Sequence, residues 1–165
     1  MAGKFGQQVM SPMVSIWDNG LDPAGFPMPF DFEGAPKQRV DLIQSGVAAG
    51  VVHDSATAMK DAVRSTGHAL PMPNSQGPLA LNLFMAPGDA TLEELIAGLD
   101  QGLLVTRFHY TVPVHPARVT VTGMTRDGTF WVEKGEIAYP VKNLRFTESY
   151  LDAFSGMEAI GRQTY

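Results

Sequence analysis

Glycine and proline set the tightest limit on what this chain can fold into. The 165 residues include 17 Gly and 12 Pro, and both residue types interrupt regular structure and favour turns. They are densest in residues 18–37, which we therefore expect to form an extended loop crossing a surface. The rest of the chain should form short helices and short strands joined by many turns.

Three segments combine an N-cap residue with apolar residues at helical spacing. The clearest is Thr91-Leu92-Glu93-Glu94, a capping box in which the Thr91 hydroxyl and the Glu94 carboxylate satisfy each other's free amides. Glu93 and Glu94 fall in the first turn, where the helix dipole favours negative charge, so we interpret them as stabilisers. The three helices are expected to begin at N-caps Ser55, Thr91 and Ser149 and to end at Gly67, Gly102 and Gly161.

The other apolar segments predict antiparallel strands. Residues 40–52 indicate a β-hairpin with its turn at 44–46, and residues 79–85 indicate one further strand. From residue 103 to 141 the pattern is that of a β-meander, with hairpin turns at 125–128 and 134–135. The sequence thus predicts an α+β fold, a β-rich domain of antiparallel hairpins or a meander with a barrel-like or sandwich-like sheet and about three short helices.

Charge and composition exclude several classes of function. The formal net charge is −5 and the pI is near 5.2, and the basic residues are scattered, so the chain should not bind nucleic acid. It contains no cysteine, which excludes disulfides, thiolate metal ligands and a cysteine nucleophile. No segment has the length of a membrane helix or the form of a signal peptide, so we expect a soluble, unexported protein without a membrane partner.

Motifs of hydrolytic and nucleotide chemistry are missing from the sequence. None of the four histidines lies in an HExxH or HExxxH arrangement, Gly-x-Ser-x-Gly does not occur, and no glycine-rich loop suits a phosphate. His109 and His115 have a spacing that two strands and a turn could bring together, which leaves open a metal-binding pair beside ordinary polar roles. We predict no catalytic residue and no metal ligand in this chain.

The densest mixture of cation, aromatic ring and imidazole lies in residues 106–110. Arg107 could hold a carboxylate bidentately; in the alternative reading it pairs with an internal acid while Phe108 packs in the core. Arg126 carries the same two readings, because the neighbouring Asp127-Gly128 is first of all a good hairpin turn. The candidate substrate-binding residues are Arg107, His109, Tyr110 and Arg126.

Five segments of the sequence share a pattern with one known family: residues 31–36, 65–69, 87–96, 102–108 and 135–143. Together they resemble the C-terminal domain of the TldD/PmbA family of zinc metallopeptidases, proteins also named modulators of DNA gyrase. The resemblance spans nearly the whole chain and implies one domain over residues 1–165, excised or truncated from a longer cytoplasmic protein.

The resemblance also implies where the chemistry of the whole protein lies. In the family, zinc is held by an HExxxH helix of the preceding N-terminal domain, with a cysteine near the C-terminus in TldD-type members, and this chain has neither. Zinc is therefore expected only in that domain or in a catalytic family partner, and no cofactor in this chain. The implied partners are a peptide substrate and the N-terminal domain or a partner subunit in a homo- or heterodimer.

Two departures from the family accompany the resemblance. Residues 109–113 replace the glycine-rich stretch that commonly follows the Arg-Phe pair, and the last strands expected after Gly161 are missing.

The resemblance leaves two hypotheses for the function. In the first, the chain is a domain that shapes a peptide channel for a metal site located elsewhere. The alternative is a noncatalytic peptide-binding or scaffolding subunit of the same family.

Overall fold

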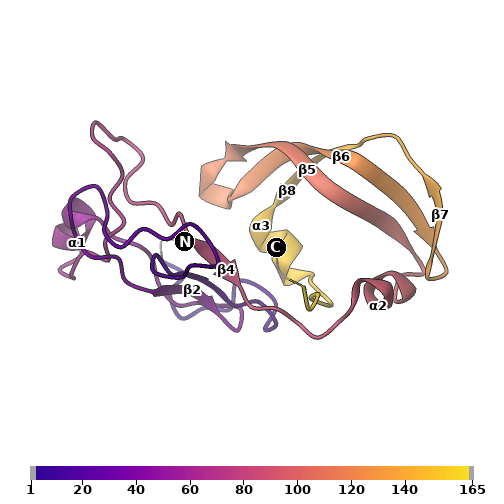
Figure 1. Ribbon diagram of the computed structural model, residues 1–165, viewed down its shortest axis with the longest axis horizontal. Coiled ribbons are helices and arrows are strands. Elements are labelled where there is room, and N and C mark those ends of the chain that lie inside the picture. Colours follow the sequence, from indigo (N-terminus) through magenta and orange to yellow (C-terminus); the bar gives the residue numbers. More distant parts are fainter. Residues whose placement is uncertain (1–2, 164–165) are drawn as a thin grey trace. The chain divides into compact units, whose positions relative to one another are not determined.

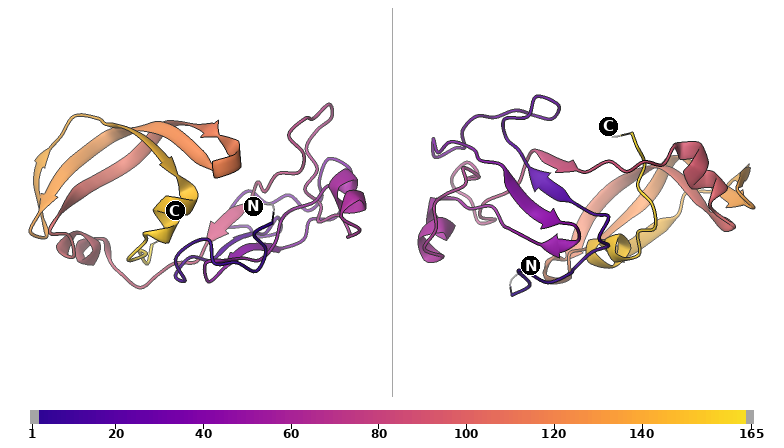
Figure 2. Two further views of the ribbon diagram at one scale, coloured as in Figure 1. Left: turned by 180° about the vertical axis from the view of Figure 1, so that it is seen from behind. Right: turned by 90° about the horizontal axis from the view of Figure 1, so that it is seen from below.

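The computed structural model describes residues 3–163, which divide into two compact units, residues 3–86 and 87–163 (Figures 1 and 2). Each unit is described by itself. Together they contain two antiparallel sheets and, among the described residues, three short α-helices. The predicted α+β class is confirmed. Neither sheet closes into a barrel within residues 3–163, because each has strands with an unpaired edge.

The first unit is built on a four-stranded sheet in the order β3-β2-β1-β4. Its strands are β1 (Ile16–Asp18), β2 (Val40–Gln44), β3 (Val47–Ala48) and β4 (Leu83–Met85). The predicted hairpin is present as β2 and β3, and its turn needs the positive φ angles of Ser45 and Gly46, 48° and 78°. Glycine suits this turn because it has no side chain to clash there. Residues 19–37 form the expected loop.

Helix α1 (Ser55–Lys60) differs from its prediction at both ends. Asp54, not Ser55, is the N-cap: its carboxylate accepts the Thr57 amide at 2.7 Å, and the Thr57 hydroxyl lies 3.1 Å from the Asp54 amide. An aspartate caps as well as a serine, and here it starts the helix one residue earlier. The helix also ends early, at Lys60 rather than near Gly67, and Met59 is 82% exposed while Ala58 is buried.

The second unit is dominated by two long strands. β5 (Gln101–His115) and β6 (Thr120–Glu133) pair along their length and are joined by a short 3₁₀ turn, η1 (Pro116–Arg118). The other edge of β6 pairs with β7 (Glu136–Pro140) near one end and with β8 (Arg145–Ser149) near the other. Figure 1 shows β5 and β6 bending together as a curved ribbon.

The predicted hairpin turn at 125–128 is wrong, because these residues continue β6. Val105 pairs with Thr129 and Arg107 with Arg126, so β6 carries one extra residue there and forms a bulge. Asp127, with a φ of 66°, absorbs the extra length. Asp-Gly therefore serves a bulge here, and the chain reverses instead at residues 116–119. The turn at 134–135 is confirmed.

Two helices complete the second unit. α2 (Leu92–Ala97) begins with the predicted capping box, in which Thr91 Oγ1 accepts the Glu94 amide and Glu94 accepts the Thr91 amide at 2.8 Å. It ends at Gly98 rather than Gly102. α3 (Tyr150–Ser155) is capped by Ser149 as predicted and ends at Gly156 rather than Gly161. No helix of the described residues is long and apolar enough to cross a membrane.

Candidate functional site

Arg107 and Arg126, both predicted to bind substrate, are cross-strand partners on β5 and β6. Asp127 lies against both: its carboxylate forms an ion pair with Arg107, and Arg126 Nε is 3.9 Å from its Oδ1. The alternative in which Arg107 pairs with an internal acid is thus present in the structure. The side chains are 52–55% exposed, so the ion pair stabilises the fold by no more than about 1 kcal/mol. Two guanidiniums facing one carboxylate leave this site net positive.

His109 and Tyr110 follow on the same strand. Their rings lie 6.4 Å apart between centroids, and Tyr110 has a φ of 53° at an irregularity of β5 that leaves it 74% exposed. His115 lies at the far end of β5, six residues from His109, on the order of 20 Å along a strand. The metal pair that the spacing left open is therefore wrong. Among residues 3–163, no group of three or more His, Asp or Glu side chains could hold a metal ion.

An aromatic cleft of about 550 Å³ lies between the sheet and α3 of the second unit. Phe108 and Phe146 form its sheet wall, in an edge-to-face contact with 4.8 Å between ring centroids. Tyr150 and Phe154, one helical turn apart on α3, form the opposite wall with stacked rings 6.0 Å apart. The cleft is lined by Phe108, Thr111, Val121, Phe146, Glu148, Ser149, Tyr150, Ala153 and Phe154.

Gly123 makes room for the sheet wall of the aromatic cleft. It pairs directly with Phe146 across β6 and β8, and a Cβ atom at Gly123 would lie 2.7 Å from Phe146 Cζ. The missing side chain lets the phenylalanine ring lie flat over the neighbouring strand. On the helix side, Ser149 ends β8 and caps α3, which directs Tyr150 and Phe154 toward the sheet.

Among the described residues, Glu148 is the only charged one that lines the aromatic cleft. One carboxylate oxygen accepts the Ser149 amide at 2.8 Å, and the side chain forms no ion pair with the described residues. Phe108 is 60% exposed and Tyr150 is 41% exposed, so both rings keep faces free for a ligand. The expectation that Phe108 packs in a core is therefore wrong. The cleft combines aromatic faces with one unpaired negative charge.

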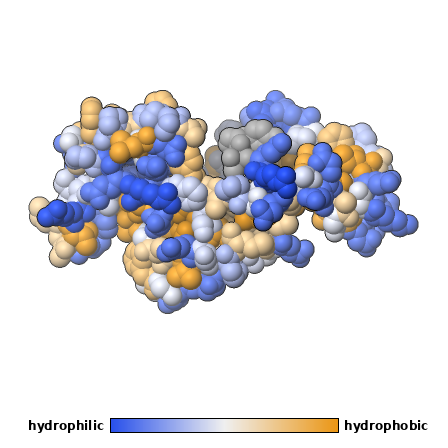
Figure 3. Space-filling view, turned by 60° about the horizontal axis from the view of Figure 1, so that its bottom comes forward, coloured by the Kyte–Doolittle hydropathy of each residue, from blue (hydrophilic) through white to orange (hydrophobic). Residues whose placement is uncertain are grey.

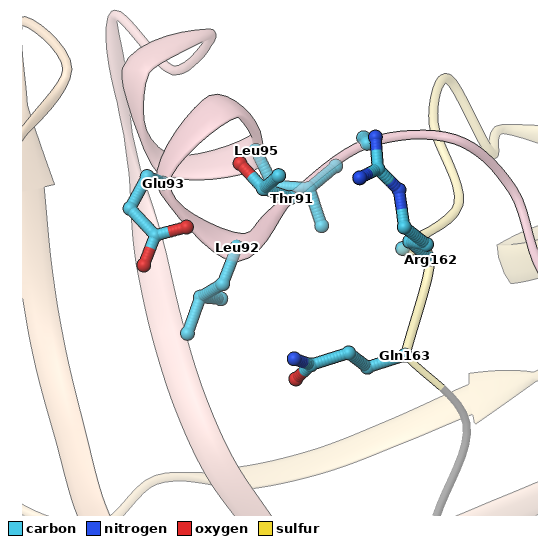
Figure 4. A pocket seen from close by; sticks show the side chains of 8 residues that line it. Thr91, Leu92, Glu93, Leu95, Arg162 and Gln163 are labelled. Carbon is cyan, nitrogen blue, oxygen red and sulfur yellow. The ribbon is translucent and has the colours of Figure 1, made fainter.

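A second, smaller pocket of about 350 Å³ lies beside the start of α2 (Figure 4). Thr91, Leu92 and Leu95 come from the helix side and Arg162 and Gln163 from the C-terminal segment. Arg162 already donates to the Asp89 carbonyl at 2.8 Å. Hydrogen bonds from Thr91 hold the pKa of the Glu94 carboxyl below its usual range, and Arg162 adds to this effect. These polar groups stabilise the turn before α2, which accounts for them without a ligand.

Residues 31–36 and 65–69, the two segments of the first unit that carry the family resemblance, meet in the structure. Asp31 is 3% exposed, and its carboxylate accepts three amides, those of Glu33, Ala35 and Ala69, each at 2.9 Å. Gly67 packs so closely on this loop that a Cβ would lie 2.4 Å from the Pro36 carbonyl oxygen. These residues tie two loops together.

A second buried polar group lies in the same unit. His68 Nε2 is 2.9 Å from Asp18 Oδ1, and His68 Nδ1 is 2.9 Å from Thr66 Oγ1. An ionised carboxylate only accepts, so Nε2 carries the proton in this pair. Both Asp18 and His68 are at most 1% exposed, and Asp18 Oδ2 accepts the Asn82 amide at 2.8 Å. This arrangement orders loops rather than facing a substrate.

The sequence prediction missed the aromatic cleft except for the position of Phe108. The signal was present in two spacings: Phe146 and Glu148 alternate on one face of a strand, and Tyr150 and Phe154 share one face of a helix. Residues 145–149 were not predicted as a strand, so the two halves of the cleft could not be joined.

Comparison with known proteins identifies the family. Residues 1–165 match the PmbA/TldA metallopeptidase C-terminal domain. The chain belongs to this family. It is 28% identical over 170 residues to the metalloprotease TldD homolog of Haemophilus influenzae, covering 96% of this chain and 33% of that protein. It is 29% identical over 135 residues to the metalloprotease PmbA of Escherichia coli O157:H7, covering 81% of this chain and 27% of that protein.

Solved structures agree with this assignment. A candidate modulator of a DNA gyrase from Thermotoga maritima superposes with a TM-score of 0.84 at 30% identity, covering 96% of this chain and 36% of that one. TldE from Thermococcus kodakarensis has the same fold, with a TM-score of 0.82 at 22% identity over 98% of this chain and 37% of its own. This PmbA/TldA-type domain thus spans about a third of the length of such relatives.

Proposed function

We propose that this PmbA/TldA-type domain is the peptide-binding C-terminal part of a metallopeptidase system, whose metal site lies in a preceding N-terminal domain or a partner subunit. The observation that carries the proposal is the family match over residues 1–165 of a chain that spans about a third of relatives named metalloproteases. The described residues do not fit zinc themselves, since their histidines and carboxylates form no group that could hold a metal. In this proposal the domain binds and orients peptide.

The free edge of β5 supports peptide binding. Within the described residues β5 pairs only with β6, so its other edge offers unpaired backbone amides and carbonyls to an extended peptide. The net-positive site of Arg107 and Arg126 lies along this strand pair and suits a carboxylate of the peptide, with His109 and Tyr110 beside it. Arg107 and Phe108 are successive residues, so the peptide can be contacted on both faces of the strand.

Exposed apolar side chains support a further partner. Phe108, Tyr110, Ile137 and Tyr139 of the second unit are each between 49% and 74% exposed. Figure 3 shows apolar residues reaching the surface in several separate patches between hydrophilic areas. Exposed apolar side chains that gather in patches favour an interface with a partner. We assign the partner as the N-terminal domain or a family subunit, in a cytoplasmic homo- or heterodimer.

A second candidate is a noncatalytic peptide-binding or scaffolding subunit that completes a dimer around a catalytic relative. The same lack of fit to zinc favours it. The two candidates differ in what must be added to this chain to obtain peptide hydrolysis. Covalently restoring the N-terminal part of the same longer protein should be enough in the first case, whereas the second requires a separate catalytic relative.

Metal content and peptide binding of the purified 165-residue chain test the proposal. We expect less than a tenth of a zinc ion per chain by elemental analysis, no hydrolysis of an unfolded peptide mixture, and measurable binding of the same mixture by calorimetry. Replacing Arg107 with Ala should weaken binding with little loss of stability, while Arg64→Ala, an exposed arginine of the first unit, should leave it unchanged. One zinc per chain together with hydrolysis would overturn the proposal, as would the lack of any peptide binding.

A further inference from the structure

Two features of the aromatic cleft define the chemistry of its occupant. Its walls are four aromatic rings, whose faces are electron-rich and attract cations. Among residues 3–163, the only charge that lines it is the Glu148 carboxylate, which has no ion-pair partner in that range. An acidic occupant would be repelled, and a purely apolar occupant would remove water from Glu148 without replacing its hydrogen bonds.

We propose that the aromatic cleft is the subsite for a basic side chain, arginine or lysine, of the bound peptide. The alkyl stem would lie against Phe108 and Phe154, and the cationic head would reach Glu148. A guanidinium suits this environment best, because it stacks on aromatic faces and also pairs bidentately with a carboxylate. The volume of about 550 Å³ is within the range of about 300–1,000 Å³ for ligand pockets.

The position of the cleft agrees with a peptide lying along β5. Phe108 faces the cleft, while its neighbour Arg107 faces the other side of the strand. A peptide with alternating side chains could therefore offer a basic group to the cleft and an acidic group to Arg107. The chain's net charge of −5 adds a long-range attraction for cationic segments. This inference rests on the proposed peptide-binding function and names the side chain that its substrates carry.

The test compares three capped peptides that differ only in the central residue: acetyl-Ala-Arg-Ala-amide and its norleucine and glutamate counterparts. Each is titrated into the ¹⁵N-labelled 165-residue chain, and the amide shifts of Ser149, Tyr150 and Ala153 report on the cleft. We expect the arginine peptide to bind about five- to tenfold more tightly than the norleucine peptide, a ratio typical of a partly exposed cation–π and ion-pair contact. The glutamate peptide should not shift these amides.

Two variants and one control make the test specific. Glu148→Gln keeps an oxygen for the Ser149 amide but removes the charge, so it should weaken arginine-peptide binding toward the norleucine level, and the aromatic rings should retain the cation–π part of the preference. Ala153→Leu fills the cleft from the helix and should weaken both peptides. Glu136→Gln removes an exposed carboxylate on β7, outside the cleft, and should change neither.

The possible failures distinguish this inference from the proposed function. Equal binding of the arginine and norleucine peptides, unchanged by Glu148→Gln, would show an apolar subsite and overturn the basic-side-chain assignment. Peptide binding that depends on Arg107 but leaves the cleft amides unshifted would also overturn it while leaving the proposed function in place. Absence of binding by all peptides and by the unfolded mixture would overturn both.

Discussion

Replacing Asp31 with asparagine should destabilise the first unit strongly although it removes no atom from the core. The carboxylate accepts three amides at 2.9 Å in a site that is 3% exposed. An asparagine keeps one oxygen for Glu33 and Ala35, but its NH₂ group then faces the Ala69 amide, another donor. One buried amide left unsatisfied costs about 1–3 kcal/mol, and the loss of charge weakens the other two bonds. The expected loss of unfolding free energy is about 2–4 kcal/mol.

The two tryptophans provide a separate reporter for each unit. Trp17 lies on β1 of the first unit and Trp131 on β6 of the second, and the chain has no other tryptophan. In a Trp131→Phe background, Trp17 fluorescence during urea unfolding reports on the unit that contains Asp31. Because the unfolding free energy falls by about 1–3 kcal/mol per molar urea, the urea midpoint should fall by about 0.7 M or more.

Glu33→Gln is the matched control because Glu33 lies in the same loop and is also a hydrogen-bonded acid. Its carboxylate accepts the amide and hydroxyl of Ser55 at an exposed position, where solvent replaces lost bonds. The control should lower the unfolding free energy by less than about 1 kcal/mol. If Asp31→Asn lowers the urea midpoint reported by Trp17 no further than Glu33→Gln does, the three buried hydrogen bonds of Asp31 do not stabilise these loops as argued.

Two further changes test other parts of the fold. Asp54→Ala should lower the unfolding free energy by about 1 kcal/mol at pH 7, because it removes the N-cap of α1. The amide and hydroxyl of Thr57 lower the pKa of Asp54, so the stabilisation by Asp54 is complete above the usual aspartate pKa of about 3.9 and is lost as the pH falls through the lower folded value. Urea unfolding followed by Trp17 fluorescence should therefore show a smaller difference between Asp54→Ala and the unmodified chain at pH 3 than at pH 7. Gly123→Ala should displace the Phe146 ring and weaken arginine-peptide binding. The unfolding free energy reported by Trp131 fluorescence should fall by about 1–3 kcal/mol. An unchanged Phe146 ring environment in aromatic NMR spectra would contradict this prediction.

Local signals predicted the helix starts better than the helix ends. The capping box at Thr91 and the cap at Ser149 are side-chain hydrogen bonds fixed by a few neighbouring residues, and both are present. The predicted helix ends, Gly102 and Gly161, come too late, because α2 ends at Gly98 and α3 at Gly156. Where a helix stops depends on which neighbours bury its next turn, and the sequence does not show those neighbours.

The strand prediction was wrong where one motif serves two structures. Asp127-Gly128 suits a hairpin turn and also suits a bulge, since both need a residue with positive φ. The choice was decided by β5, which continues past this point and pairs with β6 on both sides of the bulge. For the same reason the aromatic cleft was not predicted: it needs β8 beside β6, a pairing between residues more than 20 positions apart.

The residues that carry the family resemblance in the first unit differ in kind from those that could contact a peptide. Asp31 and His68 are at most 3% exposed, and hydrogen bonds join their side chains to neighbouring segments, with Asp18 as the partner of His68. Substituting them should therefore change stability before it changes binding. Glu148 and Arg107 present exposed charges on the second unit, so their substitution should change binding with little effect on stability. A mutational scan that scores peptide binding and urea midpoints together should separate these two sets, and a binding loss at Asp31 without a loss of stability would contradict the separation.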